Sequence, residues 1–159
     1  MHDSLHKYVE AKVLQRQLQD KNVLEVGSLN VNGSIRQLFT GNYLGVDMRE
    51  GEGVDQVCNA HALSFENESF DVIVSVEMLE HDDMFWLSIA EMGRVLKPNG
   101  YFILTARGIK FGKHAFPSDY YRFTTEAFNI LFELAGCKPL EIIEDPDFSG
   151  VFGIGIKCS

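Results

Sequence analysis

The sequence contains only three cysteines, Cys58, Cys137 and Cys158, and they stand far apart along the chain. No two of them have the close spacing of a zinc ligand set or of a redox-active dithiol. Their odd number and wide separation argue against a disulfide framework and against structural zinc. Free thiols of this kind suit a reducing compartment, so we expect a cytoplasmic protein.

Basic charge is scarce, because 14 lysines and arginines stand against 23 aspartates and glutamates, which gives a formal net charge of -9. A module that binds duplex nucleic acid needs a basic face to displace counterions from the phosphates. The composition therefore argues against nucleic acid as a partner, unless a local basic patch holds it.

Long apolar runs are missing as well. No stretch approaches the roughly 20 apolar residues of a membrane-spanning helix, and residues 1–7 lack the apolar centre of a signal peptide. We therefore expect no membrane partner. The chain does have 45% apolar residues among 159, which is enough for one sizeable core. A single domain is predicted, and self-association stays open.

Apolar periodicity divides the chain into alternating helices and strands. Helices are predicted over 5–18, 33–39, 84–96 and 125–135, and strands over 23–26, 43–47, 54–57, 70–76, 101–105, 140–143 and 151–156. The first helix is amphipathic, and it either packs on the sheet or caps a substrate. Alternation of this kind predicts a parallel sheet with right-handed crossovers. The last two strands lie too close for a helix between them, so that pair must be antiparallel.

Residues 21–33 are the stretch around which the chain is organised. A buried strand, 23–26, breaks into a glycine turn, and open α/β sheets bind nucleotide-like ligands at such carboxyl ends. Gly27 has no Cβ, so the backbone there can approach a ligand closely. Glu25 lies beneath the turn, where it can orient loop amides or meet a ligand's ammonium group.

Three further strand ends repeat this pattern, and one of them is the stretch 75–81 after the fourth strand, where a group being modified would face the ligand. Asp47 follows Gly27 by 20 residues, and a carboxylate there can accept both hydroxyls of a ribose. Asn59 and Ala60 can offer an amide side chain and a backbone N–H to an adenine edge. Each signal alone fits an ordinary turn or strand end. Their order and spacing together predict a site for a nucleotide-bearing cofactor.

Several motifs then carry a resemblance to a known family. They are Val-Leu-Glu-Val-Gly-Ser at 23–28, Tyr-Leu-Gly-Val-Asp at 43–47, residues 59–65, residues 69–75, Leu-Glu-His at 79–81, and residues 91–101. The chain resembles class I S-adenosylmethionine-dependent methyltransferases, in particular the small family with a generic methyltransferase domain. The motifs cover about residues 22–105, and the closing helix and strand pair extend the match to the end.

The resemblance implies an α/β fold with a Rossmann-like, doubly wound, mostly parallel seven-stranded sheet, in the order 3-2-1-4-5-7-6 with strand 7 antiparallel. It implies one domain over 1–159, divided into an N-terminal helix (1–20), a cofactor-binding core (21–106), a substrate-side loop (107–123) and a closing helix with its strand pair (124–159). The implied cofactor is S-adenosyl-L-methionine. Its implied contacts are Glu25, Gly27, Ser28, Asp47, Met48, Asn59, Ala60 and Glu77.

The chain departs from the family pattern in its glycine loop. The places that usually hold further glycines are occupied by Leu29 and Val31, and Gly33 comes two residues later. Asn59 stands where the family more often has aspartate. Asn99 replaces a glycine in the turn before the fifth strand, which is a tolerable change because asparagine accepts a positive φ.

Methyl transfer from a sulfonium is an in-line displacement, so the protein mainly supplies alignment and a dry pocket. An oxygen nucleophile also needs a base, and His81 is our candidate, since its ordinary pKa lies near neutrality. The alternative is a histidine bonded to Asp82 or to the backbone. His61 is interpreted as packing beside the adenine or as solvated. Asp82 and Asp83 are interpreted as a helix cap rather than a metal site, so no metal is predicted.

The connection after the fifth strand is rich in aromatic residues, and similar Asp-Tyr-Tyr-Arg-Phe-Thr segments occur in methyltransferases of this family that are thought to act on sugars and other small molecules. A small-molecule substrate is therefore implied, with His114, Tyr120, Tyr121 and Arg122 as candidate contacts. The alternative is an aromatic loop that only plugs the end of the sheet.

Two other functions remain open at this point. One is a cofactor-binding or scaffold subunit without catalysis, which the altered glycine loop keeps in view. The other is an NAD(P)-binding oxidoreductase, because Asp47 would also suit a ribose there. The loop lacks G-x-G-x-x-G, which argues against the oxidoreductase.

Overall fold

A computed structural model describes residues 2–159, and it contains one seven-stranded sheet in the order β3-β2-β1-β4-β5-β7-β6. The strands are β1 Val23–Val26, β2 Tyr43–Asp47, β3 Gln56–Val57, β4 Phe70–Val76, β5 Leu96–Arg107, β6 Cys137–Glu144 and β7 Gly150–Lys157. The implied strand order is confirmed.

The first five strands run in the same direction, and β7 runs antiparallel to both of its neighbours. β1 pairs with β2 and β4, β2 with β3, and β4 with β5, all in parallel register. β7 pairs antiparallel with β5 on one side and with β6 on the other. The last strand of the chain therefore occupies an interior place in the sheet, and the predicted antiparallel pair is confirmed.

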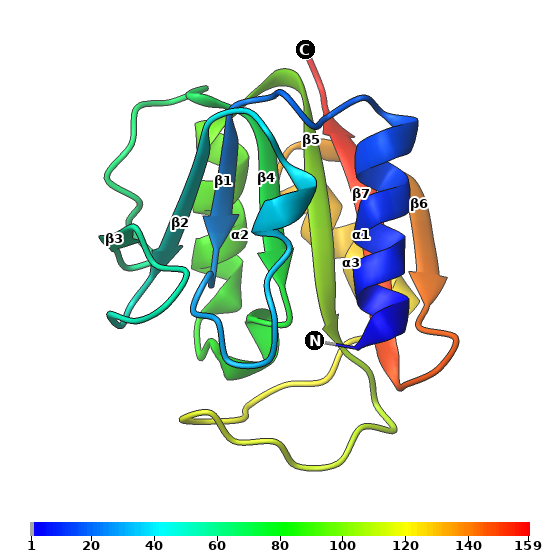
Figure 1. Cartoon of the computed structure of the whole chain (residues 1–159). Coiled ribbons are helices and arrows are strands. Elements are labelled where there is room, and N and C mark those ends of the chain that lie inside the picture. The colour runs from blue at the N-terminus through cyan, green and yellow to red at the C-terminus, as the bar shows by residue number, and fades with distance from the viewer. Residues whose placement is uncertain (1) are drawn as a thin grey trace.

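Helices cover both faces of the sheet (Figure 1). The helix α1, Asp3–Gln15, and the short 3-10 helix η1, Arg36–Leu38, cover one face. The helices α2, Phe85–Val95, and α3, Thr125–Leu134, cover the other face. α1 buries Leu5, Val9 and Val13 against apolar residues of the central strands, so it is a packing helix.

The central strand β4 is buried on both faces, as its apolar run predicts. Val72 and Val74 belong to the core cluster under α1, whereas Ile73 belongs to the cluster under α2 and α3. Alternate residues of β4 thus pack into the two core clusters on opposite faces of the sheet. This alternation fixes the register of β4 against its neighbours.

Two predicted elements are shorter in the structure. The helix expected over 33–39 is only the turn η1, because the Asn30 side chain accepts a hydrogen bond from the Gly33 N–H and holds a turn where the helix would begin. The third strand, expected over 54–57, is reduced to Gln56–Val57 at the sheet edge. Both shortened elements lie next to β1 and β2, the strands predicted to hold the cofactor.

The ends of α3 and the turn at Asn99 agree with the signals in the sequence. Thr124 caps α3 by accepting a hydrogen bond from the Ala127 N–H at 3.2 Å, and Gly136 follows the helix with a φ of 70°. Asn99 has a φ of 63°, as its tolerance of the left-handed region predicts. It lies inside the first part of β5, which begins at Leu96 instead of Tyr101.

Within residues 2–159, none of the helices combines the length and the apolar character needed to cross a bilayer.

Candidate functional site

The predicted cofactor residues come together at the carboxyl edge of the parallel strands. Gly27 follows β1, Asp47 ends β2, Asn59 follows β3 and Glu77 follows β4. The sheet order places these four strands side by side, with the connection 108–123 below the same edge (Figure 1). This is the edge at which open α/β sheets bind ligands.

Gly27 is a position that only glycine fills without strain. Its φ is 86°, and a Cβ there would lie 2.6 Å from Cγ of Met78. The N–H groups of Gly27 and Ser28 donate to the Val46 carbonyl at 2.9 and 3.0 Å, which turns the loop toward β2. The backbone is thus shaped for the close approach of a ligand.

The altered glycine loop packs against a second glycine loop, which follows β2. The Asn30 N–H donates to the Glu52 carbonyl, and the Asn30 side-chain amide donates to the Glu52 carboxylate, both at 2.8 Å. A Cβ on Gly51 would lie 2.3 Å from the Leu29 Cδ1. The close contact that a glycine at 29 would permit is therefore provided by Gly51 from the facing loop.

The Asp47 carboxylate lies beside these two loops. Its Oδ1 accepts the Arg49 N–H at 3.0 Å, and its Oδ2 accepts the Leu29 N–H at a long 3.4 Å. A carboxylate has about four acceptor positions, so acceptor capacity remains for a ribose diol. Met48, beside it, has 71% of its surface exposed, and Asn59 accepts the His61 N–H at 2.9 Å. These donors and acceptors fit a bound adenosine.

Two of the predicted cofactor residues have their side chains turned inward. Ser28 is buried, and a Cβ on Gly45 would lie 2.7 Å from its Oγ, which thus faces β2. Glu25 accepts a hydrogen bond from the Tyr43 hydroxyl at 2.7 Å, so it orients Tyr43 rather than the loop amides. Burial raises the pKa of Glu25 to about 7, although the Tyr43 bond opposes that shift.

Glu77 follows β4, between the loops after β1, β2 and β3, which we call the cofactor half of the edge, and residues 78–81, Arg107 and the connection 108–123, which we call the acceptor half. Its φ is 50°, and its Oε2 accepts a hydrogen bond from the Arg107 guanidinium at 2.5 Å. Burial raises the pKa of Glu77 to about 7, and the positive charge of Arg107 offsets part of that rise. The predicted Glu77 is therefore a half-buried carboxylate that is paired with Arg107.

Glu80 and Arg107 form the buried centre of the acceptor half, and sequence reasoning missed both. The Glu80 Oε1 lies 4.0 Å from the Arg107 Nε, and among residues 2–159 neither Glu80 oxygen accepts a well-formed hydrogen bond. Burial raises the pKa of Glu80 to about 7, against the pull of nearby backbone N–H groups and of Arg107. A carboxylate three residues after Glu77, just past a buried strand, was the available signal.

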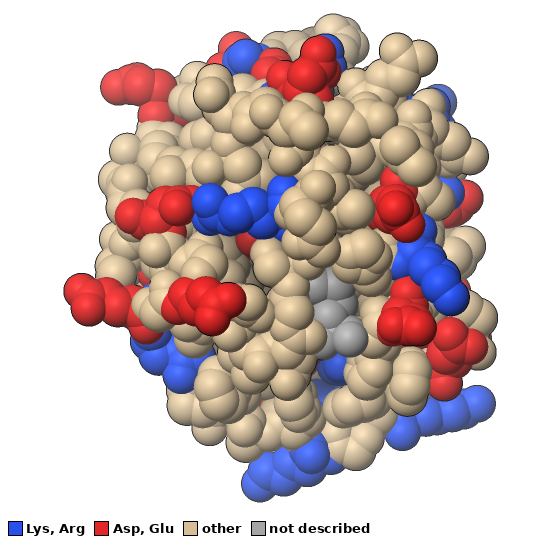
Figure 2. Space-filling model, in the orientation of Figure 1, with Lys and Arg blue, Asp and Glu red and all other residues tan. Residues whose placement is uncertain are grey.

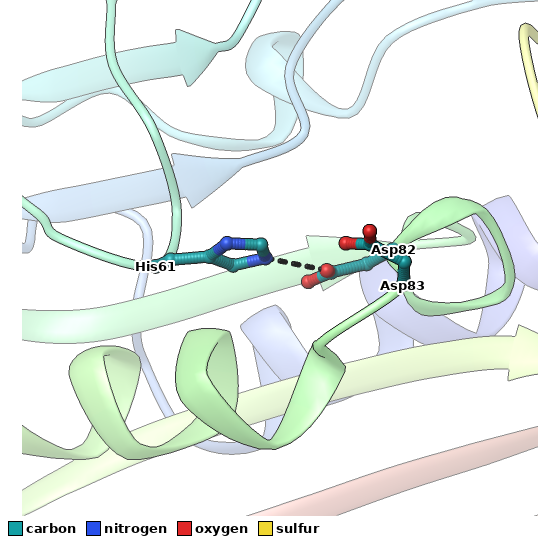
Figure 3. Close-up of side chains that lie close together, drawn as sticks. All are labelled: His61, Asp82 and Asp83. Carbon is teal, nitrogen blue, oxygen red and sulfur yellow. Dashed lines mark hydrogen bonds and ion pairs between the residues drawn. The ribbon is translucent and has the colours of Figure 1, made fainter.

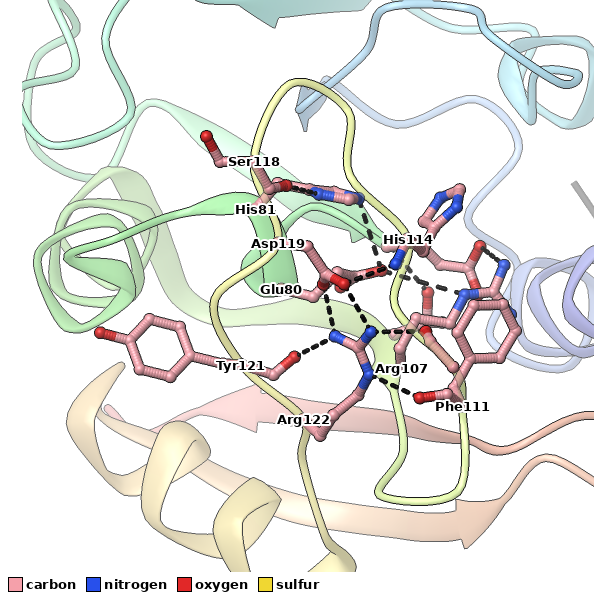
Figure 4. A network of polar contacts seen from close by, with 12 residues as sticks. Glu80, His81, Arg107, Phe111, His114, Ser118, Asp119, Tyr121 and Arg122 are labelled. Carbon is pink, nitrogen blue, oxygen red and sulfur yellow. Dashed lines mark hydrogen bonds and ion pairs between the residues drawn. The ribbon is translucent and has the colours of Figure 1, made fainter.

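His81 is held between this centre and the aromatic connection (Figure 4). Its Nδ1 lies 2.5 Å from the Ser118 carbonyl oxygen, which can only accept, so Nδ1 carries the proton. Its Nε2 lies 4.0 Å from the Glu80 Oε1, and the His114 ring stands 5.3 Å from the His81 ring. In the neutral ring, Nε2 is the nitrogen left to accept a proton.

The connection 108–123 is held together by Arg122, one of the predicted substrate contacts. The guanidinium makes five bonds, two to the Asp119 carboxylate and one each to the carbonyls of Phe111, Gly112 and Tyr121. These bonds use all five N–H donors of the guanidinium, so Arg122 holds the loop together, and its role as a substrate contact stays a prediction. The same pairing holds the pKa of Asp119 well below its usual range.

The other predicted substrate residues differ in exposure. The Tyr121 hydroxyl donates to the Asp83 carbonyl at 2.9 Å, and its ring packs edge-on against Phe85. Tyr120 is 52% exposed. Burial, with the charges of His81 and Arg107, lowers the pKa of His114, whose ring is half-buried beside His81. Of these residues, Tyr120 is the one that is exposed.

His61, Asp82 and Asp83 form a separate cluster (Figure 3). Their ligand atoms all lie within 4.8 Å of one another. The Asp82 carboxylate already accepts bonds from the His61 Nε2 at 2.6 Å, the Met84 N–H at 3.0 Å and the Ser88 hydroxyl at 2.5 Å. The histidine bonded to Asp82 is thus His61 rather than His81, and Asp82 holds the turn just before α2.

Comparison with known proteins agrees with this geometry. The model of a family described as "Methyltransferase domain" matches residues 24–104. A phthiotriol/phenolphthiotriol dimycocerosates methyltransferase of Mycobacterium ulcerans is 35% identical over 104 residues, which are 56% of this chain and 38% of that protein. A fatty-acid O-methyltransferase of Mycolicibacterium smegmatis is 26% identical over 65% of this chain and 44% of its own length. The chain thus spans about two fifths of the curated relatives it matches.

A solved structure gives the same fold. It is the 1,6-didemethyltoxoflavin-N1-methyltransferase of Burkholderia thailandensis, which was crystallised with 1,6-didemethyltoxoflavin and S-adenosylhomocysteine. The TM-score is 0.78 at 18% identity, over 97% of this chain and 78% of that one. At this identity the likeness establishes the architecture.

Proposed function

The chain belongs to the methyltransferase-domain family of class I S-adenosylmethionine-dependent methyltransferases, and from that premise we propose that it methylates a hydroxyl group of a small molecule. One observation carries the proposal. The carboxyl edge that gathers Gly27, Asp47 and Asn59 continues directly into the cluster of Glu77, Arg107, Glu80 and His81. A cofactor half and a proton-handling half thus share one edge.

The cofactor half has the residue types that S-adenosylmethionine needs. Asp47 would accept the ribose hydroxyls, Met48 and Asn59 would flank the adenine with Ala60, and the backbone at Gly27 would face the methionine part. Glu77 would lie toward the same methionine end. When bound, S-adenosylmethionine supplies an electrophilic methyl group on a positively charged sulfur.

His81 is the proposed base on the acceptor side. The Ser118 carbonyl fixes the proton on Nδ1, so Nε2 is available to take the proton of an acceptor hydroxyl. The carboxylate of Glu80, 4.0 Å from Nε2, would stabilise the imidazolium that results. This arrangement is a base oriented by one group and supported by a second.

The names of the two curated relatives support an acceptor with an apolar part, since one is a phthiotriol methyltransferase and the other a fatty-acid O-methyltransferase. The exposed aromatic side chains beside the site suit such a molecule better than a free sugar. We therefore propose a small hydroxyl-bearing molecule with an apolar body, in place of the sugar-like acceptor that the loop motif implied.

Isothermal titration calorimetry with S-adenosylhomocysteine tests the cofactor half. Asp47→Ala should weaken binding by well over tenfold, because it removes the acceptor for two ribose hydroxyls. Asp20→Ala, an exposed acid before β1, is the matched control and should bind as the wild type does. Binding of NAD without binding of S-adenosylhomocysteine would overturn the assignment.

Two substitutions at His81 separate its role as a base from its role in holding the loop. His81→Asn keeps a side-chain N–H near the position of Nδ1, whereas His81→Gln places one near Nε2. If His81 is the base, both variants should bind S-adenosylhomocysteine normally and lose turnover on a panel of hydroxylated lipids. Turnover retained in His81→Asn would assign His81 to the loop alone.

A further inference from the structure

Large apolar side chains are exposed at the carboxyl edge of the sheet. In the connection 108–123, Ile109 is 68% exposed, Phe116 is 43% exposed and Tyr120 is 52% exposed. Met48 after β2 and Phe148 in the turn between β6 and β7 are exposed at the same edge. Grouped exposed apolar side chains of this kind mark a surface that binds something, whereas scattered single ones need no explanation.

The charge of the same segment is opposite to that of the whole chain. Residues 108–118 contain Lys110, Lys113 and His114 and no aspartate or glutamate, in a chain with a formal net charge of -9. Figure 2 shows basic and uncharged side chains along the lower margin, where Figure 1 places this segment, and the acidic side chains on that face lie higher. We call residues 108–118 together with Tyr120 the basic tip.

The basic tip is held in place from within, so its exposed side chains are presented on a defined backbone. Arg122 binds the carbonyls of Phe111 and Gly112, and the Asp119 carboxylate accepts the His114 N–H at 2.5 Å. The Phe111 ring lies over the Arg107 guanidinium at 4.1 Å, and the Arg49 guanidinium lies 4.8 Å from the Phe116 ring. These contacts leave Ile109, Lys110 and Lys113 directed away from the core, as their exposure indicates.

We propose that the basic tip docks on the surface of an anionic lipid bilayer, which needs no membrane-spanning helix and replaces the expectation of no membrane partner. The apolar side chains would enter the boundary between headgroups and acyl chains, and Lys110 and Lys113 would meet the lipid phosphates. Two cations and a few apolar side chains give weak, reversible binding rather than insertion. Docking in this way places the carboxyl edge of the sheet against the bilayer. The inference concerns where the protein works, and it does not depend on the methyl-transfer step.

Vesicle flotation tests the proposal. The wild type should float with vesicles of phosphatidylglycerol and phosphatidylcholine at low salt, and it should stay in solution with vesicles of phosphatidylcholine alone. The double variant Lys110→Glu/Lys113→Glu should lose at least tenfold in apparent affinity, and so should Ile109→Ser/Phe116→Ser. The matched control, Ile130→Ser/Lys138→Glu, removes an exposed isoleucine and an exposed lysine far from the tip and should bind as the wild type does.

Several outcomes would overturn the proposal. They are a wild type that fails to float with the anionic vesicles, equal flotation with neutral ones, and tip variants that bind as the control does. Tight retention on polyglutamate that survives Ile109→Ser/Phe116→Ser would instead assign the tip to an acidic protein partner. Flotation of Asp47→Ala separates the two proposals, because lipid binding should persist in that variant when cofactor binding is lost.

Discussion

The two halves of the carboxyl edge are built in different ways. In the cofactor half, the Asp47 carboxylate is held by backbone N–H groups of Leu29 and Arg49, and two glycine loops pack against each other. In the acceptor half, Glu77 and Glu80 share one buried guanidinium, that of Arg107. The first half relies on backbone shape, whereas the second relies on buried charge.

This difference shows what each half contributes. Backbone shape is fixed once the chain is folded, so the cofactor half offers a constant surface to one ligand. Two carboxylates beside one cation hold a proton near neutrality, because burial raises the pKa of each to about 7. The acceptor half can therefore gain or lose a proton, which suits chemistry on a hydroxyl group.

The largest expected effect comes from removing the shared cation. Arg107→Met leaves the buried carboxyl group of Glu80 and the half-buried one of Glu77 without a partner charge, and it should lower the free energy of unfolding by about 3–5 kcal/mol. Urea denaturation at pH 7.5 measures this loss. Adding Glu80→Gln to Arg107→Met should recover part of it, since an amide carries no charge. A loss below about 1 kcal/mol would contradict the importance of buried charge in this half.

A smaller effect is expected from the backbone-shaped half. Gly27→Ala forces a side chain into the left-handed region and against Met78, and it should cost about 1–3 kcal/mol while weakening S-adenosylhomocysteine binding. Denaturation and calorimetry report the two changes. Met78→Ala added to Gly27→Ala relieves the contact but leaves the backbone strain. Gly112→Ala, which meets nothing within 4 Å, is the control and should change stability by less than about 0.5 kcal/mol.

The smallest effect is a dependence of stability on pH. Since the folded-state pKa of Glu80, about 7, exceeds the ordinary value of 4.5, the folded protein binds protons more tightly than the unfolded chain. Stability should therefore fall as the pH rises from about 5 to above 7. Glu80→Gln should flatten this fall by about 1–2 kcal/mol in denaturation curves across that range, whereas Glu10→Gln, an exposed control, should not. An unchanged slope in Glu80→Gln would contradict the pKa of Glu80.

Most of the fold could be predicted from the sequence, because its signals are local. The apolar run of β4, the Thr124 cap and the asparagine turn at Asn99 each depend on a few neighbouring residues. The helix predicted after Gly33 is reduced to the 3-10 turn Arg36–Leu38, and the Asn30 side chain accepts the Gly33 N–H where the helix would begin. That hydrogen bond depends on loop geometry, which apolar periodicity does not report.

In the candidate site, too, local features could be predicted from the sequence and long-range contacts could not. Gly27 and Asp47 could be found from strand-end motifs, whereas the partners of Arg122 and Glu80 could not. The sequence around Arg122 predicted a substrate contact. Only the folded loop shows that its five N–H donors are used within the loop. Glu80 lies opposite Arg107 because β4 and β5 are neighbours, a contact between residues 27 positions apart in the chain. Long-range pairs of this kind depend on the tertiary structure.

The interior place of β7 has a consequence for how the protein is made. β5 is complete at Arg107, but the strand that pairs with its free edge begins only at Gly150. While the ribosome synthesises the intervening residues, the segment Tyr101–Arg107 of β5 has no partner on the side that β7 later occupies, and another nascent chain can join such an edge. Among the described residues, β6 pairs with no strand other than β7, so it joins the sheet only when β7 does. Folding of the sheet is thus completed only after β7 has been synthesised.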